Sequence, residues 1–287
     1  MKRRTFIAAA LATVGAAPVL SLLYAWRVEC GWLDFVHRPL PIEGLPSSLS
    51  GGTLVQLSDI HVGPSVADEY LRHAFRRVHA LDADFVAVTG VWITYRGPAQ
   101  LEQLARLLED FPRGRLGTAG ILGNHDYGVG WRMDAVGERV AALGEAAGIT
   151  MLRNQARRIG GLQFVGLDDL WGPRFDPAPV LSAHGSDPAT LVLSHNPDSV
   201  DRPGWAGYRG WILSGHTHGG QCRPPFLPPP LLPVENGRYT CGPFALAGGR
   251  TLYISRGVGH LIPVRFNVRP EITVFHLVPA ASARAVS

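Results

Sequence analysis

Cysteine, methionine and charge of either sign are scarce in this chain of 287 residues. The three cysteines, Cys30, Cys222 and Cys241, form no CxxC spacing. A zinc knuckle or a dithiol redox site is therefore excluded, whereas a Cys222–Cys241 disulfide stays open beside free thiols. Charged residues make up only 17%, and the formal net charge is +4. Because the basic residues are scattered beyond the N-terminus, we expect no nucleic acid as a partner.

Long uncharged stretches are also absent, except at the N-terminus. Residues 6–26 carry no charge and lie between the basic residues 2–4 and Arg27. This length is about enough for a helix across a bilayer, and the RRTFI stretch resembles a twin-arginine signal. We predict an uncleaved anchor over residues 1–27 in the inner, cytoplasmic membrane, with cleavage after Ala16 or Ala17 as the alternative. The remaining chain would then lie on the extracytoplasmic side.

Proline, glycine and serine are concentrated in residues 38–52. We interpret this stretch as part of a linker over residues 28–52 that leads from the membrane to the domain. The remaining residues, 53–280, are numerous enough for one domain with a single large core, which we expect to be monomeric.

From Thr53 onward, short apolar runs alternate with longer amphipathic ones. The apolar runs predict strands over residues 53–58, 85–89, 118–122, 162–166, 190–194, 211–214, 251–255 and 271–277. Helical periodicity predicts helices over residues 66–80, 98–110 and 132–147. Because the strands are continuously apolar, their sheets should be covered on both faces, so the class is α/β or a layered α+β sandwich.

Metal-binding residue types follow directly after four of these strands. The clusters are Asp59 with His61, Asn124 with His125 and Asp126, His195, and His216 with His218. Ligands gather at the carboxyl ends of strands in such sheets, so we expect the clusters to converge on one crevice. Histidine, aspartate and asparagine without a thiolate favour Mn, Fe or Zn in a hydrolytic centre over a closed structural zinc site.

The order of these motifs resembles that of the calcineurin-like metallophosphoesterases. The family pattern is D-x-H, G-D, G-N-H-D/E, a lone H and G-H-x-H. This chain has DIH at 59–61, GV at 90–91, GNHD at 123–126, His195 and GHTH at 215–218. The resemblance covers residues 53–277 and implies a four-layer αββα sandwich. The GHTHGGQ segment and the closing SRGVG and PEITV segments are similar to a membrane-anchored or twin-arginine-exported bacterial branch that includes UDP-diacylglucosamine hydrolases.

The resemblance also implies two divalent metal ions, Mn, Fe or Zn. Asp59, His61 and His218 would hold one ion, and Asn124, His195 and His216 the other. The ions would activate a bridging water for attack on phosphorus. His125 would protonate the leaving group or stabilise the transition state, while Asp126 would orient His125 or cap its loop.

Val91 stands where the family has a second metal-bridging aspartate. Two dications about 4 Å apart repel by roughly 16 to 17 kcal/mol at an effective dielectric near 20, and bridging anions offset this repulsion. Asp84 lies about 23 Å from position 91 along the strand, so its carboxylate cannot reach the metal ions. Asp126, Asp168 and Asp169 are better explained by loop hydrogen bonding. We expect weak metal binding, with the second ion weak or absent, and slow hydrolysis.

Three interpretations of function follow. The chain is a membrane-anchored phosphodiesterase or pyrophosphatase for a phosphorylated lipid or nucleotide-sugar type substrate, weakened by Val91. Alternatively, it is a pseudoenzyme that binds metal and phosphorylated ligands without turnover, which Val91 favours. A histidine-rich metal-binding protein is disfavoured because the GNHD motif would then have no role.

Two further segments have both a structural and a functional interpretation. The proline-rich residues 223–233 form either a rigid surface loop or an apolar wall that contacts an acyl chain or a lipid surface. Arg96 is either an ordinary surface residue or a phosphate contact at the rim of the site.

Overall fold

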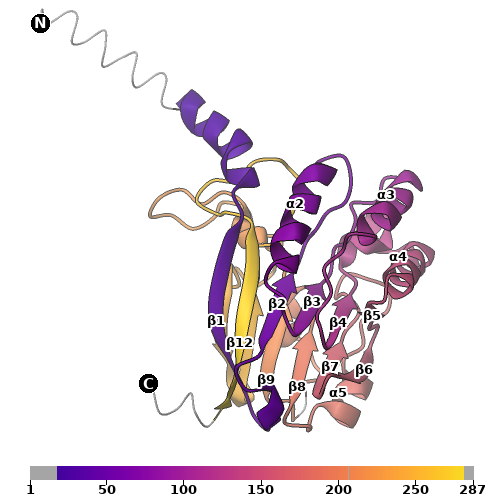
Figure 1. Cartoon of the computed structure of the whole chain (residues 1–287). Helices are drawn as coiled ribbons and strands as arrows, with labels where there is room; N and C mark the ends of the chain where they lie inside the picture. The colour runs from indigo at the N-terminus through magenta and orange to yellow at the C-terminus, as the bar shows by residue number, and fades with distance from the viewer. Residues whose placement is uncertain (1–17, 206, 281–287) are drawn as a thin grey trace, which may run out of the picture.

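Two six-stranded sheets pack face to face, with helices on their outer sides (Figure 1). The structure is a computed structural model that describes residues 18–205 and 207–280. This architecture confirms the layered α+β class that the continuous apolar strands predict and the four-layer αββα sandwich that the resemblance implies.

The first sheet has the strand order β1-β12-β2-β3-β4-β5. All neighbouring pairs are parallel except β12 with β2, which is antiparallel. The bounds are β1 Asp34–Ile42, β2 Thr53–Leu57, β3 Phe85–Thr89, β4 Gly117–Ile121, β5 Thr150–Met151 and β12 Glu271–Pro279.

The second sheet has the order β10-β11-β9-β8-β7-β6, with parallel inner strands and antiparallel strands at both edges. Its bounds are β6 Gln155–Ile159, β7 Leu162–Gly166, β8 Thr190–Leu193, β9 Gly210–Ser214, β10 Gly242–Leu246 and β11 Arg250–Ile254.

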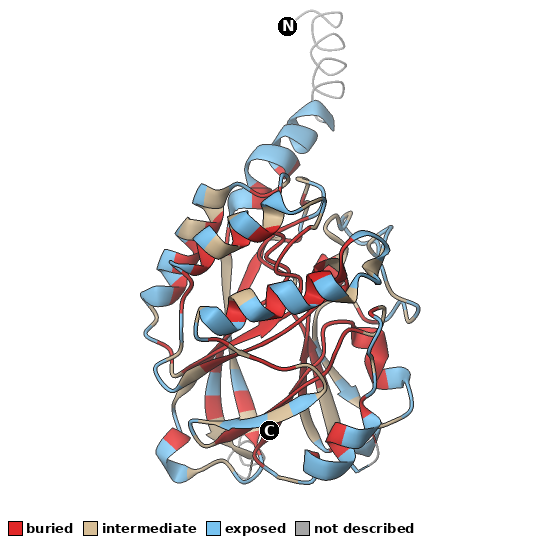
Figure 2. Cartoon of the chain, turned by 90° about the vertical axis from the view of Figure 1, so that its right-hand side faces the viewer, coloured by how far each residue is buried: buried red, intermediate tan, exposed pale blue. Residues whose placement is uncertain are grey.

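Three helices cover the first sheet and one covers the second. They are α2 Asp68–His79, α3 Ala99–Leu108 and α4 Asp134–Ala146, and then α5 Ala178–His184. Each of the first three was predicted from its periodicity, and its buried positions face the sheet while the outer side is exposed (Figure 2). Short 3-10 turns follow several strands, among them η3 Asn124–Tyr127, η5 Pro197–Asp201 and η6 His218–Gly220.

The space between the sheets is filled by apolar side chains from both of them. Phe85 and Ile121 from the first sheet belong to the same buried cluster as Phe164, Leu191 and Leu213 from the second. A second cluster lies under the helices of the first sheet, and a third lies under α5. Since burial of apolar surface is the main stabilising contribution, these three layers hold the strand ends in fixed positions.

Residues 34–42 differ from the linker expected over residues 28–52. They form β1, which pairs with β12 through nine residues from Asp34 to Ile42. Pro39 and Pro41 suggested a linker, but β1 is an edge strand, where a residue without an N–H is tolerated.

The N-terminal segment is described from Pro18. Residues 18–27 are helical and mostly exposed, and they extend away from the sandwich (Figure 1). Between residues 18 and 280, apart from residue 206, no helix has the length and apolarity needed to cross a bilayer. The RRTFI motif and the first part of the expected anchor lie outside the described residues.

The three cysteines are free thiols, so the Cys222–Cys241 disulfide that the sequence leaves open does not form.

Candidate metal centre

The carboxyl ends of strands from both sheets meet at one edge of the sandwich. Asp59 follows β2, Asn124 follows β4, His195 follows β8 and His216 follows β9. The two sheets are joined there by Gln56, whose Nε2 donates to the Ser214 carbonyl oxygen at 2.9 Å. The four sequence clusters therefore converge, as their positions after the strands predict.

Asp59, His61 and His218 form the first group of potential ligands. One ligand atom from each lies within 4.8 Å of the others, and all three residues are buried. His218 Nε2 lies 3.3 Å from Asp59 Oδ1 and 3.0 Å from His61 Nε2. This set is the one that the resemblance implies for the first metal ion.

The second group comprises the residues that the resemblance implies for the other ion: His195 and His216 are in contact, and Asn124 lines the same cavity as His216. His195 Nδ1 donates to the Thr89 carbonyl oxygen at 2.7 Å, and His216 Nε2 donates to that of Pro233 at 2.8 Å. The other ring nitrogens, His195 Nε2 and His216 Nδ1, lie 3.2 Å apart. Because the opposite nitrogen of each ring faces a carbonyl oxygen, these two nitrogens are the ones directed at the site.

The donor atoms fit divalent metal ions. Asp59 Oδ1 and Asn124 Oδ1 are buried, and neither has a hydrogen-bond partner among the described residues. A buried acceptor without a partner costs about 1–3 kcal/mol, so such atoms call for a ligand. Burial also lowers the pKa of His61 and of His216 well below its usual value, which keeps both rings neutral and able to bind a metal.

Hydrogen bonds behind the site hold these side chains in place. Asp59 Oδ2 accepts from Ser58 Oγ at 2.7 Å and from the His216 N–H at 3.0 Å, which leaves Oδ1 directed at the histidines. His61 Nδ1 lies 2.8 Å from Thr94 Oγ1, so Nε2 faces the site. Such contacts fix the orientation of metal-binding groups.

The backbone around the site is unusually left-handed. Positive φ angles occur at Val91 and at four of the expected ligands, namely Asp59, His61, His216 and His218. Conformations of this kind cost of order 1–3 kcal/mol each and concentrate at functional sites. Sharp turns directly after the strands thus direct the side chains into one cavity.

Val91 lies within this arrangement. It is fully buried, and its carbonyl oxygen accepts from the N–H groups of Ile60 and His61 at 2.8 and 3.2 Å. Its φ of +54° is an outlier for a β-branched residue, whereas aspartate and asparagine visit this region more readily. The backbone at position 91 therefore suits the carboxylate that the family pattern has there.

Neighbouring carboxylates have other partners. Asp126 accepts from the N–H groups of Trp92, Ile93 and Gly123, at 2.8 to 3.0 Å, which is the loop-capping role. Burial raises the pKa of Asp126 to about 7. Asp84 lies at the amino end of β3, where it accepts from the Thr53 N–H.

Asp168 and Asp169 belong to the loop after β7. Asp168 contacts Tyr127 and Arg153. Asp169 Oδ1 accepts from the Trp171 N–H at 2.9 Å, while its buried Oδ2 has no hydrogen-bond partner among the described residues. Burial raises the pKa of Asp169 to about 6.

A cavity of about 450 Å³ opens above the metal-binding groups, and His125 is in its wall. Two tryptophans that the sequence analysis did not single out, Trp131 and Trp171, stack there with ring centroids 4.9 Å apart. Trp131 meets the ring of His125, and Trp171 meets that of His216, edge to face. Their positions shortly after the GNHD and GLDD segments were the available signal.

Trp92 and Arg96, which follow Val91 in the sequence, do not line the cavity. Trp92 is buried and donates through Nε1 to the Ile121 carbonyl oxygen at 2.8 Å. Arg96 is exposed and is not in the wall of the cavity.

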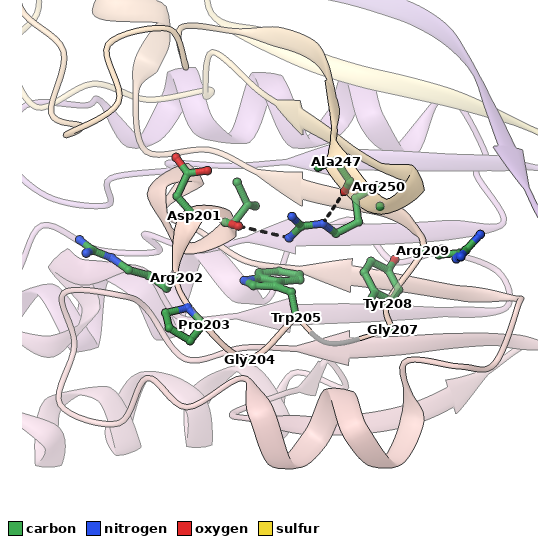
Figure 3. Close-up of a pocket in the computed structure, with 12 residues that line it drawn as sticks. Asp201, Arg202, Pro203, Gly204, Trp205, Gly207, Tyr208, Arg209, Ala247 and Arg250 are labelled. Atoms are coloured by element: carbon green, nitrogen blue, oxygen red, sulfur yellow. Dashed lines mark hydrogen bonds between the residues drawn. The ribbon is translucent and has the colours of Figure 1, made fainter.

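A larger hollow of about 780 Å³ lies at the amino ends of β9 and β11, away from these ligands. Arg250 occupies its centre and donates to the carbonyl oxygens of Val200 and Ala247, both at 3.2 Å. Figure 3 shows Arg202 and Arg209 at opposite sides, directed away from Trp205. The charged groups do not converge, so this hollow lacks the features of a catalytic site.

Comparison with known proteins assigns a family to this geometry. The family profile described as "Calcineurin-like phosphoesterase" matches residues 52–220. Phosphodiesterase YaeI of Escherichia coli is 32% identical, and the match covers 97% of this chain and all of that protein.

Two further relatives match over almost the full length. The UDP-2,3-diacylglucosamine pyrophosphatase LpxG of Chlamydia trachomatis is 26% identical over 93% of this chain and 95% of its own. The uncharacterized metallophosphoesterase YkuE of Bacillus subtilis is 30% identical, and the match covers 96% of this chain and 98% of that protein.

Proposed function

This chain belongs to the calcineurin-like phosphoesterase family, and from that membership we propose a metal-dependent phosphodiesterase or pyrophosphatase of an envelope-associated substrate. One relative is named a phosphodiesterase and another a pyrophosphatase, and both reactions are hydrolysis at phosphorus. The observation that carries the proposal is a pair of buried oxygens, Asp59 Oδ1 and Asn124 Oδ1, beside four buried histidines. Within residues 18–205 and 207–280 neither oxygen has a hydrogen-bond partner.

The residues divide into two metal-binding groups. Asp59, His61 and His218 would hold one divalent ion, and Asn124, His195 and His216 the other, with Asp59 close to both. When bound, the ions supply an acidified water and positive charge for the phosphoryl oxygens. His125, in the cavity wall, stays neutral because burial lowers its pKa to about 4.

Val91 weakens this centre because it removes a bridging carboxylate. Without that negative charge, the repulsion between two dications is offset less, so the second ion binds weakly. A pseudoenzyme that binds phosphorylated ligands without turnover is the second candidate, and the buried isopropyl group of Val91 is the observation that favours it.

The substrate we propose is a phosphorylated lipid or a nucleotide-sugar linked to lipid. One relative is named for a diacylated sugar nucleotide, and another, of Danio rerio, is named a transmembrane protein with a metallophosphoesterase domain. This chain covers 56% of the latter. We further propose that residues 1–27 anchor the chain in the inner membrane with the domain on the extracytoplasmic side, which separation of membranes and protease protection in spheroplasts would test.

One experiment separates the two candidates. The full chain is assayed on phosphomonoesters, bis-p-nitrophenyl phosphate and a nucleotide pyrophosphate, with and without Mn²⁺, beside Val91→Asp. Turnover that requires Mn²⁺ and rises in Val91→Asp supports the hydrolase. Absence of turnover in both, with metal bound in both, contradicts it and leaves a binding protein.

A further inference from the structure

The large exposed apolar side chains are gathered on one end of the molecule. Thirteen of the sixteen among the described residues lie in three segments: residues 18–32, residues 223–233 and residues 260–269. We call these segments together the apolar rim. Phe226 is fully exposed, and Leu231 and Ile262 are 79% and 61% exposed. A monomeric soluble surface rarely concentrates apolar groups in this way.

Hydrogen bonds to backbone carbonyl oxygens join the three segments. The Arg265 N–H donates to the Ala25 carbonyl oxygen at 3.0 Å, which connects the N-terminal helix to residues 260–269. The Arg223 N–H donates to Phe266 at 2.8 Å, and Gln221 Nε2 donates to the Ile262 carbonyl oxygen at 3.1 Å. The rim is therefore one connected surface, and its loops lie beside the base of the N-terminal helix (Figure 1).

The interior of the rim is held firmly. Arg265 is fully buried, and its guanidinium donates to the carbonyl oxygens of Gly259 and Val268, at 2.6 and 3.2 Å. Glu29 Oε1 accepts from the Val268 N–H at 2.6 Å. The prolines of residues 223–233 stiffen the third segment. The exposed side chains thus project from an ordered base.

The exposed charges of the rim are positive. Glu29 is the only acidic residue in the three segments, and it is buried. Arg27 and Arg223 are exposed, and within residues 18–205 and 207–280 neither has a carboxylate partner. Two arginines lie against tryptophan rings, Arg27 on Trp26 at 3.9 Å and Arg269 on Trp32 at 4.3 Å. Apolar tips with tryptophan and arginine flanks are the composition of a protein surface at a lipid headgroup layer.

The rim also borders the metal centre. Leu231, Leu261 and Ile262 are in the wall of the same cavity as Asp59 and His218. A surface that contacts the rim would thus lie next to the mouth of the cavity.

We propose that the apolar rim docks on an anionic lipid bilayer, with Phe226, Leu227, Leu261 and Ile262 inserted among the headgroups, so that the cavity takes its substrate from the bilayer. This inference rests on the proposed function, and it goes beyond the N-terminal anchor because it assigns lipid contact to the loops at the site. Anionic headgroups complement the charge of the exposed arginines Arg27 and Arg223. The inserted apolar side chains would leave water at the boundary between the headgroups and the acyl chains.

Environment-sensitive labels test the docking directly. A nitrobenzoxadiazole label is attached to Leu261→Cys in the full chain with Cys222→Ser and Cys241→Ser, since Cys30 is buried. Leu116→Cys is the matched control, because Leu116 is 43% exposed just before β4, at the opposite end of the strands. With vesicles of phosphatidylcholine and phosphatidylglycerol, the emission at 261 should shift to shorter wavelength, while that at 116 should not.

A second variant separates docking from catalysis. Phe226→Glu with Leu227→Glu places two charges at the exposed loop tip, outside the cavity wall, and should abolish the shift at 261. Turnover of soluble bis-p-nitrophenyl phosphate should be unchanged. The docking inference would be overturned if the emission at 261 did not shift, or if it shifted as much as that at 116. A shift that occurs without vesicles, through self-association, would also overturn it. If the chain without the two glutamate substitutions did not hydrolyse bis-p-nitrophenyl phosphate, that result would instead contradict the proposed function.

Discussion

Val91 and Gly123 are in contact where the neighbouring strands β3 and β4 end, and Val91 Cγ2 occupies the space that a side chain at position 123 would need. Asn124, whose Oδ1 has no partner among the described residues, follows directly. The valine therefore lies beside Asn124, and it has a positive φ angle that β-branched residues rarely adopt.

Val91→Asp should raise both metal occupancy and hydrolysis. The new carboxylate offsets the repulsion between the ions, and aspartate tolerates the positive φ angle. Elemental analysis after desalting should give a metal content closer to two ions per chain, and turnover of bis-p-nitrophenyl phosphate should increase at least tenfold, the change that about 1.4 kcal/mol of barrier produces.

Val91→Asn is the matched control for backbone strain. Asparagine accepts the left-handed conformation as well as aspartate does but brings no charge. Only Val91→Asp should gain metal, because charge and not relief of strain offsets the repulsion between the ions. Equal metal content in the two variants would show that strain rather than charge limits binding.

Metal binding should stabilise the fold through His218. A ligand that binds only the folded state adds about 2.7 kcal/mol to the free energy of unfolding when its free concentration is one hundred times its dissociation constant. Added Mn²⁺ should raise the unfolding temperature of the native chain, and a chelator should reverse this. His218→Ala removes one ligand of the first group, so its unfolding temperature should respond less; the same increase in both chains would place the ion elsewhere.

His125→Asn should slow catalysis while the metals stay bound. Burial keeps the ring neutral, so its one N–H can donate a hydrogen bond to the transition state, and loss of one such donor costs about 10²- to 10³-fold in rate. Metal content should not change, since His125 belongs to neither metal-binding group. A lower metal content would instead make His125 a ligand.

Asp126→Ala should act mainly on stability. Three backbone N–H groups, of Trp92, Ile93 and Gly123, lose their acceptor, and each unsatisfied buried group costs about 1–3 kcal/mol. Urea unfolding should show a loss of several kcal/mol. An unchanged midpoint with a large fall in rate would instead favour an orienting role towards His125.

His260 should make the fold sensitive to acid. Burial lowers its pKa from 6.5 to about 4, while Nε2 donates to the Ser65 carbonyl oxygen. Its contribution to stability is complete above pH 6.5 and is lost as the pH falls towards 4, because the unfolded chain binds the proton first. Between pH 4 and pH 6.5, the unfolding free energy of His260→Gln should depend less steeply on pH than that of the native chain. The difference in slope should correspond to at most one bound proton.

The eight strands predicted from the sequence are the eight inner strands of the two sheets. The four that were missed, β1, β5, β6 and β10, are the edges. Inner strands are covered on both sides and so read as continuous apolar runs. Edge strands carry prolines, as at Pro39 and Pro41, or exposed arginines, as at Arg157 and Arg158, and these residues resemble those of loops.

The convergence of the metal-binding residues was predictable because each stands at the end of an apolar run. The tryptophan pair was not, since Trp131 and Trp171 lie on loops about forty residues apart whose approach depends on how the two sheets pack. The backbone role of Asp126 was likewise one of two open alternatives, because a sequence does not show which N–H groups a carboxylate will meet.

The pairing of β1 with β12 decides how far the chain can be shortened from its N-terminus. A protein that starts at Thr53 keeps every metal-binding residue but leaves nine residues of β12 without a neighbour on one side. An open apolar ladder of that length invites pairing with other molecules, so such a fragment should precipitate or form aggregates. A fragment that begins before Asp34 keeps β1 at this edge, and its two prolines make β1 a poor template for pairing with other molecules.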